Sequence, residues 1–562
     1  MIQPIWQAQY QPGVPNELEP PPFSSLVDLF TRTCQRFADK VAFENFGATL
    51  TYHQLEQQSR QFAAYLQHIL ELKKGDCVAI MLPNVLQFPI ALFGILRAGL
   101  VFTNINPLYT SDELTHQLRD SNAKVIIVLE NFAHTVAQAL PETDLKHVIV
   151  THLGDSLPFP KAQVINFMLK YVKKAIPNWH IPNAIWFNQL LNDGNDLGLC
   201  PVTLNDDDIA CLQYTGGTTG QAKGAVLLHR NLLANVDQVI AWTADTLEVG
   251  KEIVITALPL YHVFALTVNL FAFFRLGARN VLISNPRDIP RFITQLIRTR
   301  FTFITGVNTL FNALLHHPKF DQIDFSSVKF SIAGGMAVQQ SVAQAWQKRT
   351  GTVLLQGYGL TEASPVVSMN PLDVKKYNSS IGLPLPSTHI GIFDEQGQAL
   401  SIEETGELWV KGPQVMAGYW QSPQLTNQVI TQEGWLKTGD LAKVDAQGFI
   451  YLIDRKKDMI NVSGFKVFPN EVEEVIADYP DVDEVGVIGM PCVQTGEQVI
   501  AFVTVNDKPS FDSQQLLAHC HDHLTGYKIP KQIIVVDQLP KTNVGKVLRR
   551  QLRELAQAQL QV

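Results

Sequence analysis

Residues Tyr214 to Ala225 read YTGGTTGQAKGA, and this stretch decides how the rest of the chain is interpreted. Four glycines, three threonines and one lysine fall within twelve residues, directly after an apolar run that begins at Ile209. Glycines permit positive φ and close backbone approach, so successive N–H groups can converge on an anion while hydroxyls and a lysine add donors. We therefore expect a strand that runs into a phosphate-binding loop, itself neither helix nor sheet.

Two alternatives to this interpretation follow from the glycine content. The Walker phosphate loop has the form GxxxxGK[ST], but Lys223 follows Ala222 and precedes Gly224, so that motif is excluded. A flexible linker is the other alternative, because isolated glycine-rich stretches are weak signals. Interleaved threonines and a lysine argue against a mere spacer, and the decision passes to the rest of the chain.

Length and composition indicate a globular protein of several domains. A chain of 562 residues is too long for one core, and 46% hydrophobic with 17% charged residues is ordinary for a folded protein. The net charge of −8 gives no general attraction to nucleic acid, so an anionic substrate needs a local basic site. Six cysteines without CxxC spacing fit a reducing compartment and indicate neither zinc nor a disulfide framework.

The sequence predicts a cytoplasmic protein. The first residues lack the basic start and apolar core of a signal peptide. The most apolar windows, 88–105 and 265–283, are interrupted by arginines and fall short of the roughly 20 apolar residues that a spanning helix needs. We expect neither secretion nor a transmembrane segment.

Helical periodicity alternates with short apolar runs through the first two thirds of the chain. Predicted helices at 51–70 and 87–98 flank a predicted buried strand at 77–81. This alternation implies parallel sheets covered on both faces. We predict an α/β fold: a large N-terminal domain of several subdomains, 1–455, with parallel sheets and a β-rich subdomain from about 357 to 451, and a small α+β C-terminal domain, 456–562. The charged stretch 454–458 has no apolar residue and is predicted to be a linker.

The stretch 161–186 differs from its surroundings. Apolar residues lie at helical spacing, and Lys170, Lys173 and Lys174 are interleaved with them. The pattern fits a basic amphipathic helix that touches anionic lipid, but a surface helix with solvated lysines is the commoner explanation of such a pattern. Both interpretations stay open at this point.

Three further motifs carry candidate chemistry. In QGYGLTE, 356–362, glycines beside a tyrosine offer a flat face to a purine, and a threonine next to a carboxylate suits a phosphate with its hard cation. In WLKTGD, 435–440, Asp440 is placed to accept two hydrogen bonds from ribose hydroxyls. In PKTNVGKVLRR, 540–550, the glycine turn presents Lys546 at its tip and the basic residues beyond it face solvent. Taken singly, these motifs also fit two ordinary turns and a basic tail.

Together, the four motifs occur in one order over more than 300 residues and resemble the adenylate-forming superfamily, which includes acyl-CoA synthetases, luciferases and peptide-synthetase adenylation domains. The segment 434–467 is similar to the signature of fatty acyl-CoA synthetases. The segments 257–267, 285–296 and 305–315 are similar to those of bacterial long-chain fatty acid:CoA ligases. The resemblance covers essentially the full chain.

This resemblance implies an enzyme that converts a long-chain fatty acid and ATP, with Mg²⁺, to acyl-AMP and pyrophosphate, and then transfers the acyl group to CoA. An acyl-AMP ligase that loads an acyl carrier protein is the alternative from another class, and a non-catalytic acyl-nucleotide binder is a third. The expected partners are fatty acid, ATP and CoA, with peripheral contact at the cytoplasmic face of the inner membrane. A homodimer is compatible with the resemblance, and nucleic acid is not expected.

The resemblance also assigns roles to residues of this sequence. The β- and γ-phosphates of ATP are assigned to Thr215, Gly216, Gly217, Thr218, Thr219, Gly220 and Lys223. Adenine is assigned to Gly334, Gly335 and Tyr358, the α-phosphate to Thr361, Mg²⁺ to Glu362, and ribose to Asp440 and Arg455. Lys546 is expected to bridge the fatty carboxylate and the α-phosphate from a mobile C-terminal lid.

The remaining roles concern the acyl group and CoA. Lys457 is implied to be the hinge about which the lid rotates, bringing Ser463, Gly464 and Lys466 to the CoA path. The acyl entrance is assigned to His262, and the wall of the acyl site to Val307 and Leu310. For these three residues, a place in the protein core is the alternative that periodicity does not separate.

Overall fold

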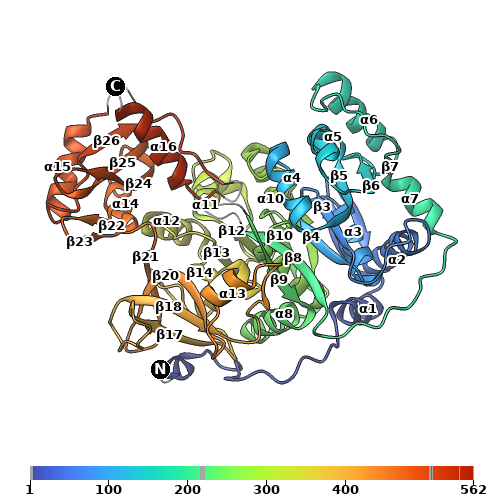
Figure 1. Ribbon diagram of the computed structural model, residues 1–562, viewed down its shortest axis with the longest axis horizontal. Helices are drawn as coiled ribbons and strands as arrows, with labels where there is room; N and C mark the ends of the chain where they lie inside the picture. The colour runs from blue at the N-terminus through green and yellow to red at the C-terminus, as the bar shows by residue number, and fades with distance from the viewer. Residues whose placement is uncertain (1–3, 216–221, 506–507, 509–510, 543–544, 561–562) are drawn as a thin grey trace.

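The computed structural model describes residues 4–215, 222–505, 508, 511–542 and 545–560. Figure 1 shows a large N-terminal lobe with the smaller C-terminal lobe, in red, set to one side of it. The predicted α/β fold class, with parallel sheets, a β-rich subdomain and a small α+β C-terminal domain, is confirmed. The boundary at 455/456 falls between the last strand of the large lobe and the first strand of the small one, and it stays a prediction.

One sheet of the large lobe carries the glycine-rich stretch at its edge. Its strand order is β19-β9-β8-β4-β3-β5-β6-β7, and from β8 through β7 neighbouring strands run parallel. The strands are β3 (Cys77–Met81), β4 (Val101–Asn104), β5 (Ala123–Leu129), β6 (His147–Thr151), β7 (Ile185–Trp186), β8 (Ile209–Thr215), β9 (Lys223–Leu228) and β19 (Gly418–Tyr419).

A second sheet continues the α/β alternation. Its order is β16-β15-β14-β13-β12-β10-β11-β1-β2, parallel from β14 to β1 and antiparallel at both edges. The strands are β1 (Val41–Asn45), β2 (Ala48–Thr51), β10 (Ile253–Thr256), β11 (Arg279–Leu282), β12 (Phe303–Gly306), β13 (Phe330–Gly334), β14 (Leu354–Gly359), β15 (Val366–Met369) and β16 (Leu383–Pro384).

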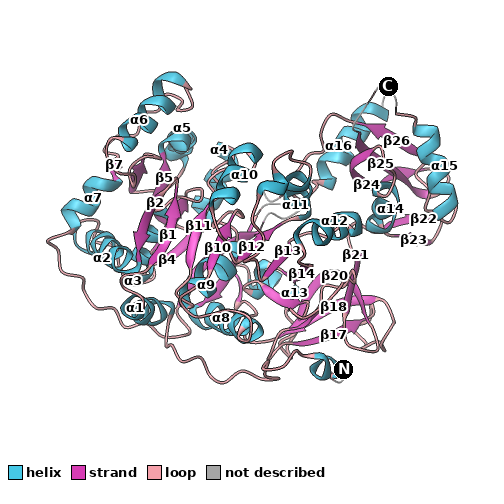
Figure 2. Cartoon of the chain, turned by 180° about the vertical axis from the view of Figure 1, so that it is seen from behind, coloured by secondary structure: helices cyan, strands magenta, loops and turns pink. Residues whose placement is uncertain are grey.

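Helices cover the faces of these sheets (Figure 2). The apolar side chains of the helices and strands are buried in three hydrophobic clusters. Helix α3 is buried over almost its whole length, as its nearly continuous apolar sequence requires. The helices of this lobe are α1 (Leu26–Arg36), α2 (Tyr52–His68), α3 (Gln87–Arg97), α4 (Ser111–Asp120), α5 (Ala133–Ala139), α6 (Lys161–Phe167), α7 (Phe187–Gly194), α8 (His229–Thr243), α9 (Phe273–Arg275), α10 (Ile289–Arg298), α11 (Asn308–Leu315), α12 (Gln340–Thr350) and α13 (Pro423–Val429).

The β-rich subdomain and the C-terminal lobe complete the chain. The first is an antiparallel sheet of β17 (His389–Phe393), β18 (Gly406–Lys411), β20 (Leu436–Val444) and β21 (Ile450–Arg455). The C-terminal lobe packs helices against β22 (Ile460–Val462), β23 (Phe465–Val467), β24 (Val482–Cys492), β25 (Gly496–Val505) and β26 (Gln532–Val535). Its helices are α14 (Pro469–Ala477), α15 (Ser513–His523) and α16 (Arg549–Leu560).

Three local expectations are corrected. The stretch 214–225 is not loop throughout: β8 extends to Thr215 and β9 begins at Lys223, because these two residues continue the antiparallel pairing of the hairpin. The stretch 161–186 is no single helix, since α6 passes into a π-helical turn, η4 (Met168–Val172), and β7 follows. The stretch 454–458 is more than a linker, because the side chains of Asp454 and Asp458 are buried.

Among the helices that the structure describes, none combines the length and the apolar character needed to cross a bilayer.

Candidate active site

A cleft of about 2480 Å³ is lined by residues of both lobes. It brings together most of the residues that the sequence assigned to the site: Thr215, Lys223, His262, Val307, Gly334, Gly335, Tyr358, Thr361, Glu362, Asp440, Arg455, Lys457 and Lys546. Four other assigned residues, Leu310, Ser463, Gly464 and Lys466, do not line this cleft. The assigned residues 216–220 lie outside the described residues.

The base of the glycine-rich hairpin opens into the cleft. Thr215 and Lys223 face each other across β8 and β9, so the hairpin begins and ends at the cleft wall. Its stem is fixed to α4, because the Tyr214 hydroxyl donates to Asp120 and His116 Nε2 lies 3.0 Å from the carbonyl oxygen of Ala222. The strand ends on either side of residues 216–221 are therefore held in place at the cleft wall.

Glu362 lies beside this hairpin in a short 3₁₀ turn, η7 (Thr361–Ala363). The hydroxyl of Tyr419 donates to Glu362 Oε1 at 2.7 Å. Burial and the charge of Glu362 raise the pKa of Tyr419, so its hydroxyl stays protonated and acts as a donor. The Lys223 ammonium lies 5.5 Å from the centre of the Tyr419 ring. Sequence reasoning missed Tyr419, whose Gly-Tyr-Trp context carries no distinctive signal.

Glycines keep the carboxyl ends of β13 and β14 open to the cleft. Gly334 pairs with Gly357, and a Cβ on Gly334 would lie 2.9 Å from the Phe264 ring and 3.0 Å from the Gly357 carbonyl oxygen. Gly335 has φ +80°, which favours glycine. The Tyr358 side chain, adjacent on β14, is buried and also lines the cleft. These residues form the surface of the cleft to which the sequence assigned adenine.

Asp440 joins this surface to the β-rich subdomain. Its Oδ2 accepts a hydrogen bond from the Tyr358 hydroxyl at 2.6 Å, and its Oδ1 lies 3.2 Å from Arg455 Nε on the paired strand β21. Burial and Asp440 together raise the pKa of Tyr358, so the phenol remains neutral. A carboxylate has about four lone-pair sites, so these two contacts leave acceptor capacity for ribose hydroxyls.

Lys546 reaches the cleft from the C-terminal lobe. The turn that presents it rests on α11, because a Cβ on Gly545, at φ +83°, would lie 2.6 Å from Thr309 Oγ1. Burial, with help from Arg455 and Arg549, lowers the pKa of Lys546 from 10.5 to about 8. A buried lysine with a lowered pKa in a cleft is typical of functional sites.

His262 lies close enough to Lys546 for the two charges to interact. Burial and the lysine lower the pKa of His262 to about 4, so its imidazole is neutral at pH 7. The backbone N–H of Phe264 donates to its Nδ1 at 3.3 Å, which leaves Nε2 to carry the proton as a donor. Val307 also lines the cleft. Leu310 does not, because its side chain packs between two hydrophobic cores.

The deep end of the cleft is apolar. It is lined by side chains of α8, α9 and the strands β12 and β13 that are almost fully buried: Val239, Phe273, Phe303, Phe330 and Ile332. The sequence assigned none of these five residues to the acyl site.

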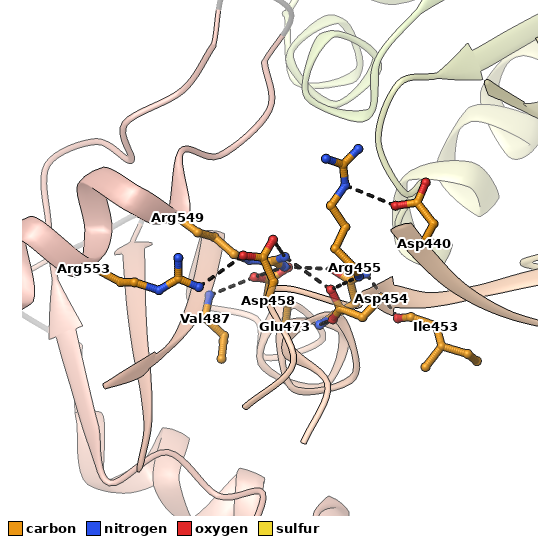
Figure 3. A network of polar contacts seen from close by, with 10 residues as sticks. Asp440, Ile453, Asp454, Arg455, Asp458, Glu473, Val487, Arg549 and Arg553 are labelled. Atoms are coloured by element: carbon orange, nitrogen blue, oxygen red, sulfur yellow. Dashed lines mark hydrogen bonds and ion pairs between the residues drawn. The ribbon is translucent and has the colours of Figure 1, made fainter. Parts of the chain in front are cut away.

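Arg549 connects the two sides of the predicted hinge, as Figure 3 shows. Its guanidinium lies 3.4 Å from Asp454 Oδ1, 3.3 Å from Asp458 Oδ2 and 2.9 Å from Glu473 Oε1. Burial raises the pKa of Glu473, and the carboxylates hold the pKa of Arg549 above its ordinary value. The expectation that the basic residues after Lys546 face solvent is wrong for Arg549, whose side chain is 14% exposed.

The residues assigned to CoA lie on the surface of the C-terminal lobe. Ser463 and Gly464 have φ +52° and +87° and form the tight turn between β22 and β23. Lys466, on β23, lies 3.5 Å from Glu395 of the β-rich subdomain. In this orientation of the lobes the turn is outside the cleft, so its part in CoA binding stays a prediction.

A parallel α/β lobe, a glycine-rich hairpin at the cleft and a lysine delivered by a second lobe define the class of adenylate-forming enzymes. Comparison with known families agrees: residues 30–420 match the AMP-binding enzyme family and residues 471–546 match the AMP-binding enzyme C-terminal domain. The chain belongs to the AMP-binding enzyme family.

Similar proteins cover the whole chain. A long-chain-fatty-acid–CoA ligase of Escherichia coli O6:H1 is 52% identical over 556 residues, 99% of this chain and 99% of that protein. Among solved structures, an anthranilate CoA ligase in complex with anthranoyl-AMP has a TM-score of 0.83 and 25% identity, covering 96% of this chain and 99% of its own. ATP-bound MatB from Rhodopseudomonas palustris has a TM-score of 0.80 and 27% identity, covering 94% and 98%.

Proposed function

We propose that this protein is a long-chain fatty acid:CoA ligase that forms AMP. The observation that carries the proposal is Lys546 of the C-terminal lobe, which enters the cleft beside His262 and near Asp440 and Arg455. The high identity to long-chain-fatty-acid–CoA ligases over the full chain supports the same substrate class.

In the first half-reaction, an oxygen of the fatty carboxylate attacks the α-phosphorus of ATP. An acyl–O–P bond forms, the bond to the β-phosphate oxygen breaks, and pyrophosphate leaves. Both reactants are anions, so catalysis depends on positive charge and donors placed where negative charge develops. Lys546 and the neutral donor of His262 serve the carboxylate and α-phosphate, while Thr215 and Lys223 hold the outer phosphates. Thr361 contributes a hydroxyl near the α-phosphate.

The nucleotide is held by the surfaces described above. Gly334, Gly335 and Tyr358 receive the adenine, and Asp440 with Arg455 receives the ribose. Because Tyr358 and Arg455 already fix the Asp440 carboxylate from two sides, the ribose meets a preorganised acceptor.

The residues present fit a magnesium ion that arrives with ATP. Mg²⁺ usually binds through one or two carboxylates together with substrate phosphates and retains several waters. Glu362 supplies such a carboxylate at the cleft. When bound, the ion neutralises phosphate charge.

The apolar end of the cleft supports binding of a long acyl chain. Val239, Phe273 and Phe303 present almost fully buried surfaces behind the His262 entrance. Burial of each methylene contributes about 0.8 kcal/mol, so an extended alkyl chain gains binding energy with every added carbon that fits.

In the second half-reaction the thiol of CoA attacks the acyl carbonyl. A C–S bond forms, the acyl–O–P linkage breaks at its carbon, AMP leaves, and the thiol proton passes to solvent. We propose that the C-terminal lobe first rotates about Lys457, which withdraws Lys546 and brings Ser463, Gly464 and Lys466 to the CoA path. The present orientation supports an adenylation state, since the TM-score is 0.80 with ATP-bound MatB and 0.70 with apo MatB.

Separate assays of the half-reactions test this function. Lys546→Ala should abolish pyrophosphate release from ATP and palmitate, yet leave formation of palmitoyl-CoA from supplied palmitoyl-AMP largely intact. Equal loss of both half-reactions contradicts the alternation of lobes. If the wild-type enzyme makes palmitoyl-AMP but no thioester when CoA is added, it is instead an acyl-AMP ligase that loads a carrier protein.

We also propose that the enzyme, in the cytoplasm, binds the anionic face of the membrane through α6 and η4. Large apolar side chains are exposed in and just before these elements, between 52% and 81%, at Phe159, Val164, Phe167, Tyr171 and Val172. Exposed lysines at 161, 170, 173 and 174 are interleaved with them along the sequence. Figures 1 and 2 show α6 at the end of the molecule remote from the C-terminal lobe. Exposed apolar groups rimmed by lysines are complementary to anionic lipid.

Sedimentation with vesicles tests this surface. The protein should bind vesicles that contain phosphatidylglycerol more tightly than neutral vesicles, and Phe167→Ser with Val172→Ser should weaken that binding. Val493→Ser, which removes a fully exposed apolar side chain elsewhere, is the matched control. Unchanged binding of the double variant removes this proposal and leaves the catalytic one intact.

A further inference from the structure

The hydroxyl of Tyr419 is a polar group in the cleft to which the proposed reaction assigns no direct role. It donates to Glu362 Oε1 at 2.7 Å, and the ring of the same side chain lies under the Lys223 ammonium at 5.5 Å. Glu362 comes from η7, beside the second sheet, and Lys223 begins β9 of the first sheet. One side chain therefore contacts two site residues that are far apart in the sequence and supported by different sheets.

The backbone around Tyr419 is tied to both of these supports. On one side, the N–H of Met416 donates to the carbonyl oxygen of Glu362 at 2.8 Å. On the other, the N–H of Trp420 donates to the carbonyl oxygen of Gly224 at 2.8 Å, and Tyr419 pairs with Ala225 across β19 and β9. The ring is thereby held in a fixed position relative to both the carboxylate and the hairpin.

This geometry restricts groups that are otherwise free to move. Glutamate and lysine have long side chains, and ordering each of them costs up to about 2 kcal/mol of rotamer entropy. A neutral hydroxyl bonded to an ionised carboxylate makes a charge-assisted hydrogen bond, which is stronger than one between neutral partners. The face of an aromatic ring attracts an ammonium within about 6 Å. Both effects order the site before the nucleotide arrives.

We propose that Tyr419 is a positioning residue for adenylation. Its hydroxyl sets the orientation of the Glu362 carboxylate toward the metal of the metal–ATP complex, and its ring sets the position of Lys223 toward the outer phosphates. The inference rests on the proposed function, because it concerns the same nucleotide site. The hydroxyl of Tyr419 contacts Glu362, and its ring contacts Lys223. Substitutions that remove the hydroxyl alone or the whole ring can therefore separate the two effects.

Binding of Mn²⁺ in place of Mg²⁺, followed by electron paramagnetic resonance in the presence of ATP, measures this role without turnover. Tyr419→Phe keeps the ring and removes the hydroxyl, so it should weaken Mn²⁺–ATP binding about tenfold. Binding of ATP alone, in the presence of a chelator, should change less than twofold. Tyr419→Leu removes the ring as well and should weaken both, because Lys223 loses its support.

Kinetics give a second measurement. In Tyr419→Phe, kcat/KM for pyrophosphate release should fall about tenfold and recover partly at high Mg²⁺, while thioester formation from supplied palmitoyl-AMP stays unchanged. Tyr10→Phe is the matched control, because it removes a hydroxyl that donates to the carbonyl oxygen of Pro384 at 2.7 Å, outside the cleft.

The outcomes separate this inference from the proposed function. If the wild-type protein binds Mn²⁺–ATP and Tyr419→Phe binds it equally well, the positioning role is overturned and the ligase function stands. If the wild-type protein itself fails to bind Mn²⁺–ATP, the proposed function fails. A loss in Tyr10→Phe as large as in Tyr419→Phe shows a general effect of lost stability and also overturns the inference.

Discussion

Replacing Lys546 by arginine should remove an alkaline limit on adenylation. Burial and the nearby cations Arg455 and Arg549 lower the pKa of Lys546 from 10.5 to about 8. At about 1.4 kcal/mol per pKa unit, this difference disfavours the ammonium form of Lys546 in the cleft by about 3 kcal/mol. We expect the negative charge of bound ATP to compensate this cost.

The direction of the pKa shift of Lys546 determines the pH range over which adenylation should decline. The folded-state pKa lies below the unfolded value, so the cost of the charge is fully present below pH 8 and disappears as the pH rises toward 10.5. Adenylation needs the ammonium, and above pH 8 its fraction falls about tenfold per pH unit. Because kcat/KM reports the free enzyme and kcat the complex, the alkaline fall in kcat should occur at higher pH than that in kcat/KM.

Pyrophosphate release without CoA, measured from pH 6 to 10, checks this prediction. The wild-type kcat/KM for ATP should decline above pH 8, whereas Lys546→Arg should be slower but flat to pH 10, because guanidinium remains charged. Lys319→Arg, at an exposed position, should retain the wild-type profile. The same alkaline decline in Lys546→Arg, or a flat wild-type profile, refutes the assignment of this pKa to Lys546.

Three further substitutions have defined outcomes. Asp440→Asn removes the charge that orders Arg455. Since a hydrogen bond to a charged group contributes about 1.5–3 kcal/mol, the KM for ATP should rise tenfold or more in steady-state assays, and the KM for palmitate should not change. Arg549→Met leaves buried carboxylates without their shared cation, so urea unfolding should show a C-terminal lobe that is less stable by about 3–5 kcal/mol. Arg550→Met, which removes an exposed ion pair, should have little effect. Val239→Trp fills the apolar end of the cleft and should lower kcat/KM for palmitate more than for octanoate in a chain-length series.

Much of the fold could be predicted because local patterns coincide with tertiary burial. The apolar run 77–81 is β3, and the periodic segment 51–70 contains α2, begun by a capping box between Thr51 and Gln54. The stem of the glycine-rich hairpin was harder to predict. Polar Thr215 and Lys223 belong to strands only because each pairs with the other across the hairpin.

The site was predicted where chemistry is concentrated in short motifs and missed where it depends on distant partners. Lys546 follows a glycine that marks a turn, so its place at a turn was predictable from the sequence. Arg549 and Tyr419 carry no such mark, because their partners lie 76 to 95 and 57 residues away. A charged residue without a recognisable motif is predicted to be exposed to solvent. Only the folded chain shows which of these residues are buried together.

Asp454 provides a last test, because its contacts cross the predicted hinge. It precedes Lys457, yet the backbone N–H of Asn470 donates to its Oδ2 at 2.8 Å and Arg549 lies 3.4 Å from its Oδ1. Rotation about Lys457 would separate these groups, so the contacts belong to one orientation of the lobes.

Asp454→Asn weakens these contacts while preserving the size of the side chain. We expect pyrophosphate release to slow about tenfold relative to thioester formation from supplied palmitoyl-AMP, since hydrogen bonds to charged groups contribute about 1.5–3 kcal/mol. Asp481→Asn, at an exposed position of the C-terminal lobe, should change neither rate. Because a general loss of stability lowers both half-reactions together, only a changed ratio between them shows that Asp454 favours the adenylation orientation. An unchanged ratio means that the contact stabilises the fold without selecting an orientation.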